Sequence, residues 1–202
     1  MYHKILVLFT LFSSCLQMQS GQQQPQASDN TLIIYLTRTN NTKAIAELIQ
    51  KHLGGDMMAL ELENPYPEDY ATIVRQVAWE NETGYLPPLR TRINLDQYDT
   101  VFLGFPTWGM QLPPPIKSFL HKYELTGKTI IPFNTNSVYG AGSVFRQIIQ
   151  LCPNSTIMKG LSLKGGIERD GIYQVIKGEK RREAELEVIS WLRKLKDRKS
   201  VV

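Results

Sequence analysis

Short apolar runs alternate with polar segments from residue 31 onward. The runs at Leu32–Leu36, Val101–Phe105 and Thr129–Phe133 are typical of strands that are covered on both faces. Weaker runs at Met57–Leu62 and Ser155–Leu163 complete the expected strands, each bounded by turn-forming or helical sequence.

Apolar residues recur at helical spacing between these runs. Lys43–Leu53 places Ile45, Leu48, Ile49 and Leu53 on one face, and a pair of glycines then ends the helix. The same spacing predicts further helices at Asp69–Glu82, Pro115–Tyr123, Ser143–Leu151 and Glu179–Lys196.

Strands that alternate with helices predict an α/β protein with a doubly wound, five-stranded parallel sheet and helices on both faces. No internal repeat or second domain is visible, so residues 31–198 are expected to form one domain. Ligands of such sheets bind beyond the carboxyl ends of the strands, near the point where the strand order reverses. The loops after the first, third and fourth strands are therefore the candidate site. Residues 63–93 could be a lid, a docking surface or extra core, and their apolar helical stripe favours core.

Residues 1–30 read as an export signal followed by a Gln-rich polar tether. A cationic start precedes the apolar run Ile5–Phe12. This run is too short to span a bilayer, because a transmembrane helix needs roughly 20 residues. Cys15 follows two serines and resembles the lipobox cysteine of bacterial lipoproteins, which is lipidated and becomes the mature N-terminus. Ordinary signal cleavage near Ser20 is the alternative. We expect an exported protein of the bacterial cell envelope or periplasm, bound to a membrane only through a lipid on Cys15.

The charge pattern bears on the expected partners, and the cysteine content bears on disulfide formation. Lys and Arg number 23 against 19 Asp and Glu, giving a formal net charge of +4. No stripe of cations interleaved with aromatic residues is present, so nucleic acid is not an expected partner. Cys152, the one cysteine beyond residue 30, ends an apolar helical pattern and is expected to be buried and structural.

The loop after the first strand reads TRTNNT and leads into a helix. The N-terminus of a helix offers unpaired N–H groups and the positive end of a dipole, which attract an anion. Threonine hydroxyls add donors, and Asn40 stands where glycine would serve best, since Asn tolerates left-handed backbone angles. The alternative is a polar turn in which Asn41 or Thr42 caps the helix.

The other two loops carry aromatic and small polar residues. Phe105–Met110 reads FPTWGM, and its tryptophan could stack on a planar ring or fold back over the next helix. Gly109 can adopt peptide orientations that other residues resist. Asn134–Ser143 reads NTNSVYGAGS, with one aromatic residue before a helix N-terminus that Ser143 could cap.

These three loops together resemble the flavodoxin family over roughly residues 31–196. The resemblance implies a flavodoxin-like fold with strand order 2-1-3-4-5 and FMN as the cofactor, with no metal. It implies that the phosphate is held by Thr37, Arg38, Thr39, Asn40, Asn41 and Thr42. It also implies that the flavin ring is enclosed by Pro106, Thr107, Trp108, Gly109, Thr135, Asn136, Ser137, Tyr139, Gly140 and Gly142.

The resemblance implies that Trp108 stacks on the ring and that Tyr139 covers its second face. It also implies that the Gly109 peptide turns toward the flavin. The implied function is electron transfer between redox partner proteins or small acceptors such as quinones, with no catalytic side chain assigned. The alternatives are an NAD(P)H:quinone or FMN-dependent reductase, and an envelope protein that keeps the fold without flavin.

Acidic residues are missing from the two ring loops, Gly104–Ile116 and Asn134–Ser143. Flavodoxins usually carry carboxylates there, which disfavour the anionic reduced flavin and attract basic partners. We therefore expect a less depressed second reduction potential and a partner that is not selected by a basic docking face.

Overall fold

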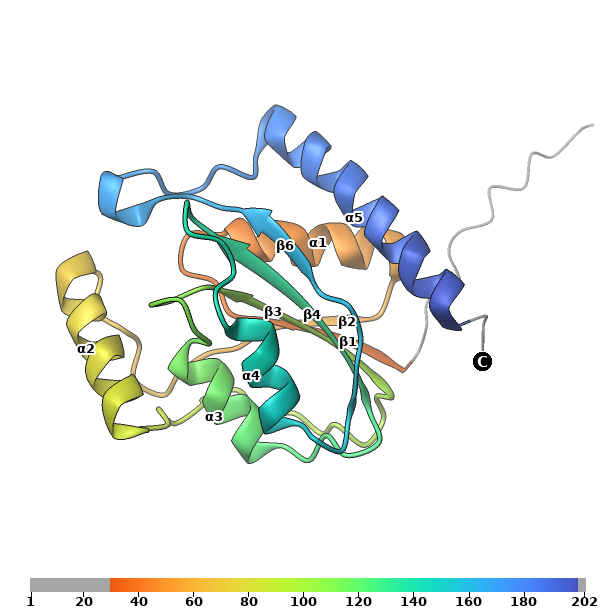
Figure 1. Cartoon of the computed structure of the whole chain (residues 1–202), viewed down its shortest axis with the longest axis horizontal. Coiled ribbons are helices and arrows are strands. Elements are labelled where there is room, and N and C mark those ends of the chain that lie inside the picture. The colour runs from red at the N-terminus through yellow and green to blue at the C-terminus, as the bar shows by residue number, and fades with distance from the viewer. Residues whose placement is uncertain (1–29, 200–202) are drawn as a thin grey trace, which may run out of the picture.

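The computed structural model describes residues 30–199, so the export signal and Cys15 lie outside the described residues. The chain forms a parallel sheet between two layers of helices (Figure 1). Its strands are β1 (Thr31–Tyr35), β2 (Asp56–Ala59), β3 (Thr100–Pro106), β4 (Thr129–Asn136), β5 (Thr156–Ile157) and β6 (Leu161–Lys164). Its helices are α1 (Asn41–Leu53), α2 (Tyr70–Thr83), α3 (Pro114–Lys122), α4 (Val144–Leu151) and α5 (Gly178–Lys199), with a 3₁₀ turn η1 at Glu168–Asp170.

The strand order is β2-β1-β3-β4-β5, with every named pair parallel, as the resemblance implied. The expected single strand Ser155–Leu163 is instead two short strands, β5 and β6, which both pair with β4. Between them Gly160 passes so close to the Phe145 ring that an added Cβ would lie 2.4 Å from it. The edge of the sheet beside β4 is therefore made of two short strands, which are separated where the chain passes the Phe145 ring of α4.

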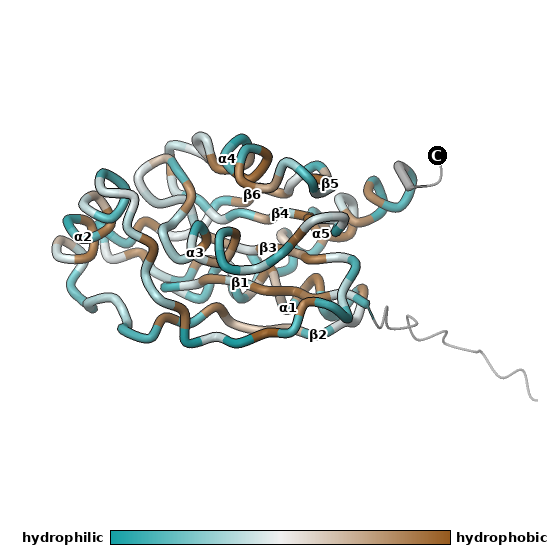
Figure 2. The backbone as a smooth tube through the Cα atoms, turned by 90° about the horizontal axis from the view of Figure 1, so that it is seen from below, coloured by the Kyte–Doolittle hydropathy of each residue, from teal (hydrophilic) through white to brown (hydrophobic). Residues whose placement is uncertain are grey.

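Side chains of β1 alternate between two buried cores. Leu32 and Ile34 join a cluster with residues of α3 and α4, whereas Ile33 and Tyr35 join one with residues of α1 and α5. This alternation follows from the period of two along a strand, and it explains why the apolar run is continuous. Figure 2 shows hydrophobic segments gathered along the central strands. Cys152 is buried and free, as predicted.

Helix α2 stands apart from both layers, beyond the ends of the strands (Figure 1). It begins after Asp69, whose carboxylate accepts the Thr72 N–H at 2.7 Å, and it ends at Gly84 with φ 69°, as N-capping and left-handed C-capping dictate. Ile73 and Val77 are buried, but Tyr70 and Val74 are 40% and 47% exposed. The apolar stripe of this segment is thus only partly core. Within the described residues, no helix has the length and apolar character that a membrane span requires.

Candidate functional site

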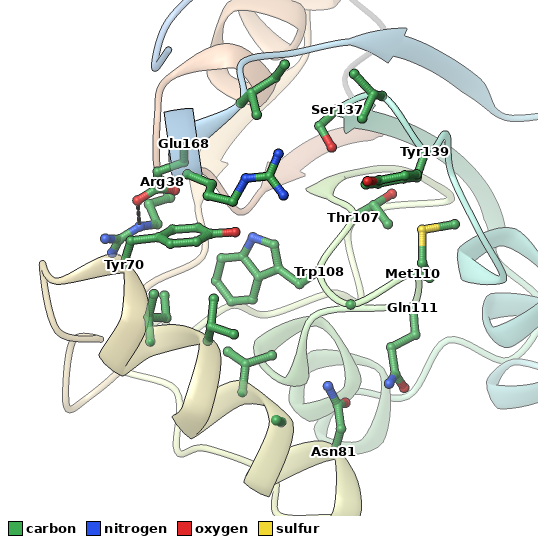
Figure 3. A pocket seen from close by; sticks show the side chains of 18 of the residues that line it. Arg38, Tyr70, Asn81, Thr107, Trp108, Met110, Gln111, Ser137, Tyr139 and Glu168 are labelled. Atoms are coloured by element: carbon green, nitrogen blue, oxygen red, sulfur yellow. Dashed lines mark hydrogen bonds and ion pairs between the residues drawn. The ribbon is translucent and has the colours of Figure 1, made fainter. Parts of the chain in front are cut away.

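A cavity of about 560 Å³ opens at the carboxyl edge of the sheet, between α2 and the loops after β1, β3, β4 and β6 (Figure 3). Of the residues predicted for the site, it is lined by Arg38, Thr107, Trp108, Gly109, Ser137, Tyr139 and Gly140. The rest of the predicted set does not line it: Thr37, Thr39, Asn40, Asn41, Thr42, Pro106, Thr135, Asn136 and Gly142. The cavity is therefore lined by six of the ten residues predicted for the ring, and the predicted phosphate loop adjoins it through Arg38.

The backbone of the TRTNNT loop has the shape that the sequence suggested. Asn40 has φ 60° and ψ 5°, the left-handed conformation expected of a residue standing in for glycine. It is also the N-cap of α1, and no side chain caps this helix end, so the alternative in which Asn41 or Thr42 caps the helix is not what the structure shows. The first intrahelical bond shown is from Ala44 N–H to the Asn40 carbonyl, which leaves the preceding N–H groups available to an anion.

The side chains of Asn41 and Thr42 are held by the surrounding protein. Asn41 Oδ1 accepts from the N–H groups of Val175 and Ile176 at 2.9 and 3.1 Å, and its Nδ2 donates to the Tyr173 carbonyl at 2.8 Å. Thr42 Oγ1 shares a hydrogen bond of 2.8 Å with Thr135 Oγ1. Both residues are buried. These bonds position the loop and occupy the Asn41 side chain, so Asn41 offers an anion only its backbone N–H.

Arg38 is bound on three sides away from the helix end. Its Nε donates to Glu168, and its other nitrogens donate to the carbonyls of Pro67 and Glu68. Figure 3 draws the bond to Glu168 as a dashed line. Arg38 therefore ties the loop to the start of α2 and to η1, two walls of the cavity.

Thr37 stands out from its neighbours. Its hydroxyl is the one buried side-chain oxygen or nitrogen that lacks a hydrogen-bond partner in the described part of the chain. A buried hydroxyl without a partner costs about 1–3 kcal/mol. Such groups are rare in folded proteins and call for an explanation. An anion at the helix end would supply the missing acceptor.

The loop after β3 makes a tight turn at the cavity. Trp108 and Gln111 exchange backbone hydrogen bonds, and the two residues between them, Gly109 and Met110, have φ 57° and 63°. Positive φ at both central positions is typical of a type I′ turn. Glycine adopts it freely, but Met110 adopts it at a cost. The Met110 carbonyl accepts from the Ser143 N–H and Oγ, at 2.9 and 3.1 Å.

The Trp108 ring stands in the middle of the cavity wall. Figure 3 shows it with Tyr70 on one side and Tyr139 on the other. Tyr66 packs against it in a T-shaped arrangement, with ring centroids 5.4 Å apart and planes at 81°. Tyr139 is 70% exposed at the mouth. Two aromatic side chains from different loops thus border the space where a planar ring would lie.

The loop after β4 is organised by Asn134, which the sequence prediction left out. It is fully buried, and its Nδ2 donates to the Phe105 carbonyl at 3.1 Å and to Thr107 Oγ1 at 2.9 Å. Asn136 donates to Asn134 Oδ1 at 3.2 Å and to Ser162 Oγ at 2.8 Å. These bonds join β3, β4 and β6 beneath the cavity, and they leave the side chain of Asn136 with a structural role here.

Charged groups reach the cavity from segments other than the two ring loops. Glu82 of α2 and Glu168 and Arg169 of η1 line it, and Glu168 is paired with Arg38. The carboxylate of Asp170 raises the pKa of Arg169. Behind the wall, Lys117 Nζ donates to Asn81 Oδ1 at 2.7 Å and Gln111 Oε1 at 2.9 Å, and burial lowers the pKa of Lys117.

The α2 wall was missed as part of the site. Tyr70, Val74 and Ala78 line the cavity. Tyr70 and Val74 belong to the apolar stripe for which core was the favoured interpretation. The signal was present in the sequence as an apolar face on a long segment between two strands, but its direction depended on how α2 packs. Among residues 30–199, no cluster of His, Cys, Asp or Glu could hold a metal ion.

Comparisons with solved structures support the fold. A candidate flavoprotein from Bacteroides uniformis is 25% identical, with 70% of this chain and 94% of that chain covered and a TM-score of 0.61. One from Bacteroides eggerthii is 23% identical, with 81% and 95% covered and a TM-score of 0.65. A flavoprotein from Lactobacillus acidophilus, solved in complex with FMN, is 18% identical, with 68% and 93% covered and a TM-score of 0.58.

Comparisons of sequence identify the family. A search of curated proteins found no significant match. The sequence model described as Flavodoxin matches residues 30–178, which is most of the 202-residue chain and includes all three site loops. This chain therefore belongs to the flavodoxin family.

Proposed function

We propose that this flavodoxin binds FMN at the carboxyl edge of its sheet and carries electrons between redox partners. The observation that supports this most strongly is the buried, unpartnered hydroxyl of Thr37, beside an uncapped helix N-terminus and next to a cavity with an aromatic wall. FMN would supply the electron-accepting chemistry. The protein would hold its two ends and adjust its surroundings.

The phosphate would be held mainly by backbone. The N–H groups at the start of α1, the left-handed turn at Asn40 and the Thr37 hydroxyl form a donor set without a bound cation. Arg38 is neutralised by Glu168, so its role in this proposal is to fix the loop rather than to contact the phosphate. Thr39 Oγ1 accepts from Asn41 Nδ2 at 2.9 Å, which leaves the Thr39 hydroxyl hydrogen available.

The ring would lie against Trp108, with Tyr139 at its outer face. The Gly109–Met110 peptide is the movable element beside it. Ser143 fixes the Met110 carbonyl, so this peptide can rotate without shifting Gln111. Rotation would return Met110 from φ 63° to a negative φ, which relieves backbone strain. Gly109 would keep its positive φ, which explains a glycine at this position.

The first test is a titration of the purified full-length protein with FMN, followed by flavin fluorescence. We expect saturable quenching and a yellow protein after gel filtration, and we expect Trp108→Ala to weaken binding. No binding of FMN would favour an envelope protein that keeps the fold without flavin. Stepwise reduction would then give the two one-electron potentials. A strongly depressed second potential would contradict the effect expected from the acid-free ring loops.

An NAD(P)H:quinone or FMN-dependent reductase is a second candidate, supported by the apolar α2 wall. Tyr70 and Val74 are large, partly exposed and face the same cavity as Trp108, so a second planar molecule would find apolar contacts there. Steady oxidation of NADPH by the FMN-loaded protein and a quinone would favour this candidate. Its absence, with rapid electron exchange with another redox protein, would favour the carrier.

We further propose that the protein is exported and that Cys15 is lipidated. The cationic and apolar start of residues 1–14 and the position of Cys15 support this. Mass spectrometry of the protein from a bacterial membrane fraction should find an acylated N-terminal Cys15. A mature N-terminus near Ser20 would instead show ordinary signal cleavage.

A further inference from the structure

Tyr66 packs against Trp108, the aromatic residue proposed to stack on the flavin ring. It lies in the segment before α2, and its ring forms a T-shaped pair with the Trp108 indole, at a centroid distance of 5.4 Å and an interplanar angle of 81°. This edge-to-face geometry is the favourable arrangement for aromatic pairs. Tyr66 and Trp108 are both partly buried and pack against the same hydrophobic core. The orientation of the indole thus depends on where Tyr66 is held.

Glu80 holds Tyr66. Glu80 is 1% exposed, and its carboxylate accepts from the Tyr66 hydroxyl and from Gln76 Nε2, the latter at 2.9 Å. Both donors are neutral, and no ion pair to Glu80 is found within residues 30–199. A buried carboxylate without a cation depends on each hydrogen bond that it accepts. The Tyr66 hydroxyl is therefore strongly retained.

The hydroxyl keeps its proton under physiological conditions. Burial first, and then the hydrogen bond to Glu80, raise the pKa of Tyr66 far above its usual range. The donor is thus always present. Glu80 itself is anchored near the end of α2, where its carbonyl accepts the Tyr85 N–H at 2.9 Å. The chain of contacts runs from a helix end through a carboxylate and a tyrosine to the indole.

We infer that Tyr66 and Glu80 are positioning residues that fix the plane of the Trp108 indole, and through it the affinity and the reduction potential of the flavin. This inference rests on the proposed binding of FMN beside Trp108. It assigns a role to the segment between β2 and β3, which supplies both residues: that segment sets the geometry of the aromatic wall.

The predicted effects follow from the aromatic pair. The energy of one edge-to-face contact corresponds to a factor of about three to ten in an equilibrium constant. Tyr66→Leu should therefore raise the dissociation constants of FMN and riboflavin by that factor. Tyr66→Phe keeps the ring and loses only the bond to Glu80, so its effect should be smaller. Glu80→Gln keeps an acceptor for Tyr66 and should have the smallest effect.

The reduction potential separates positioning from general stability. The electron-rich face of the indole favours the oxidised ring over the electron-rich reduced ring. A looser indole should therefore raise the two-electron midpoint potential, by about 30 mV for a tenfold loss in binding of the oxidised form alone. A variant that is only less stable keeps the potential of the wild type at temperatures well below its melting point.

The experiment compares Tyr66→Leu, Tyr66→Phe and Glu80→Gln with a matched control, Tyr123→Phe. Tyr123 also donates one hydroxyl, to the Thr91 carbonyl at 3.0 Å, but its ring packs on Phe119 rather than on Trp108. Near-ultraviolet circular dichroism of the flavin-free proteins, with Trp108→Phe subtracted, reports the Trp108 environment directly. We expect this signal, the riboflavin dissociation constant and the midpoint potential to change in the graded order given above, with no change in the control.

A failure of the proposed FMN binding and a failure of the positioning role give different results. If the wild type binds no FMN, the proposed function fails, while a changed Trp108 dichroism in Tyr66→Leu still shows that Tyr66 positions the indole. If the wild type binds FMN but Tyr66→Leu and Tyr66→Phe leave the dichroism and the potential as they are in the control, the inference is overturned. Should Tyr66→Leu fail to fold, Tyr66→Phe decides the matter: a dichroism and a potential equal to those of Tyr123→Phe would overturn the inference.

Discussion

Replacing Thr37 with Val should stabilise the flavin-free protein and weaken FMN binding at the same time. The hydroxyl is buried and lacks a hydrogen-bond partner within the described residues. Valine has the same branched shape, so the change removes the polar atom without opening a cavity. These opposite signs distinguish a ligand-binding hydroxyl from one that merely supports the fold.

The size of each effect can be worked out from this environment. An unsatisfied buried hydroxyl costs about 1–3 kcal/mol, and an apolar group of the same shape removes that cost. We expect the free energy of unfolding to rise by about 1 kcal/mol, which is about 2–4 °C in melting temperature for a domain of this size. A hydrogen bond to a charged phosphate is worth about 1.5–3 kcal/mol, so FMN affinity should fall about tenfold to a hundredfold.

The assay pairs thermal melting without ligand with fluorescence titration by FMN and riboflavin. Riboflavin lacks the phosphate, so its affinity should not change. The matched control is Thr42→Val, which breaks the 2.8 Å bond to Thr135 and strands a buried partner. It should lower the melting temperature. A lower melting temperature for Thr37→Val, or an FMN affinity within twofold of the wild type, would refute this reasoning.

Further predictions concern the backbone, the thiol and pH. Asn40→Ala should cost about 1 kcal/mol because alanine disfavours φ 60°, whereas Asn40→Gly should change the free energy of unfolding by less than about 0.5 kcal/mol in urea titrations; equal losses would contradict this. Gly109→Val leaves room for its Cβ but strains φ 57°, so potentiometry of the FMN-loaded protein should show a changed gap between the two one-electron potentials, and an unchanged gap counts against the turn. Burial raises the pKa of the Cys152 thiol to about 11. A thiol reagent at pH 8 should therefore react with it only after denaturant is added, and a fast reaction with the folded protein would contradict this prediction. Hydrogen bonds from Lys51 and then His52 hold the pKa of Glu185 below its ordinary 4.5; this stability is present above that value and is lost as pH falls through the lowered pKa. Glu185→Gln should therefore reduce the stability gained between pH 3 and pH 7, by less than about 1 kcal/mol because this surface ion pair is partly exposed to solvent, and an unaltered pH profile would argue against the pair.

The fold was predictable because its apolar pattern is determined by burial. Strand β1 is buried along its whole length, and the continuous run Leu32–Leu36 reflects a sheet that is covered on both faces. The break between β5 and β6 was not predictable. It depends on the Phe145 ring, which presses against Gly160 from a different element, and no local pattern carries that contact.

Part of the site was also predictable, where backbone conformation decides it. Asn40 was expected to adopt the left-handed region, and its φ of 60° confirms this. The gathering of Trp108 and Tyr139 at one cavity follows from parallel strands, whose carboxyl ends meet at one edge.

The partners of polar side chains could not be read from the sequence. Arg38 and Asn41 sit in a loop rich in anion-binding groups, but their side chains bind Glu168 and the backbone near Tyr173. Those partners lie more than a hundred residues away along the chain. The exposed side of α2 was hidden for the same reason, since its apolar stripe serves both core and cavity.

A crystal structure of the protein grown with FMN tests the central claim most directly. We predict the phosphate at the N-terminus of α1, with Thr37 Oγ1 donating to one of its oxygens and the flavin ring against Trp108. Density for FMN at another site, or a Thr37 hydroxyl still without a partner when the flavin is bound, would contradict the account.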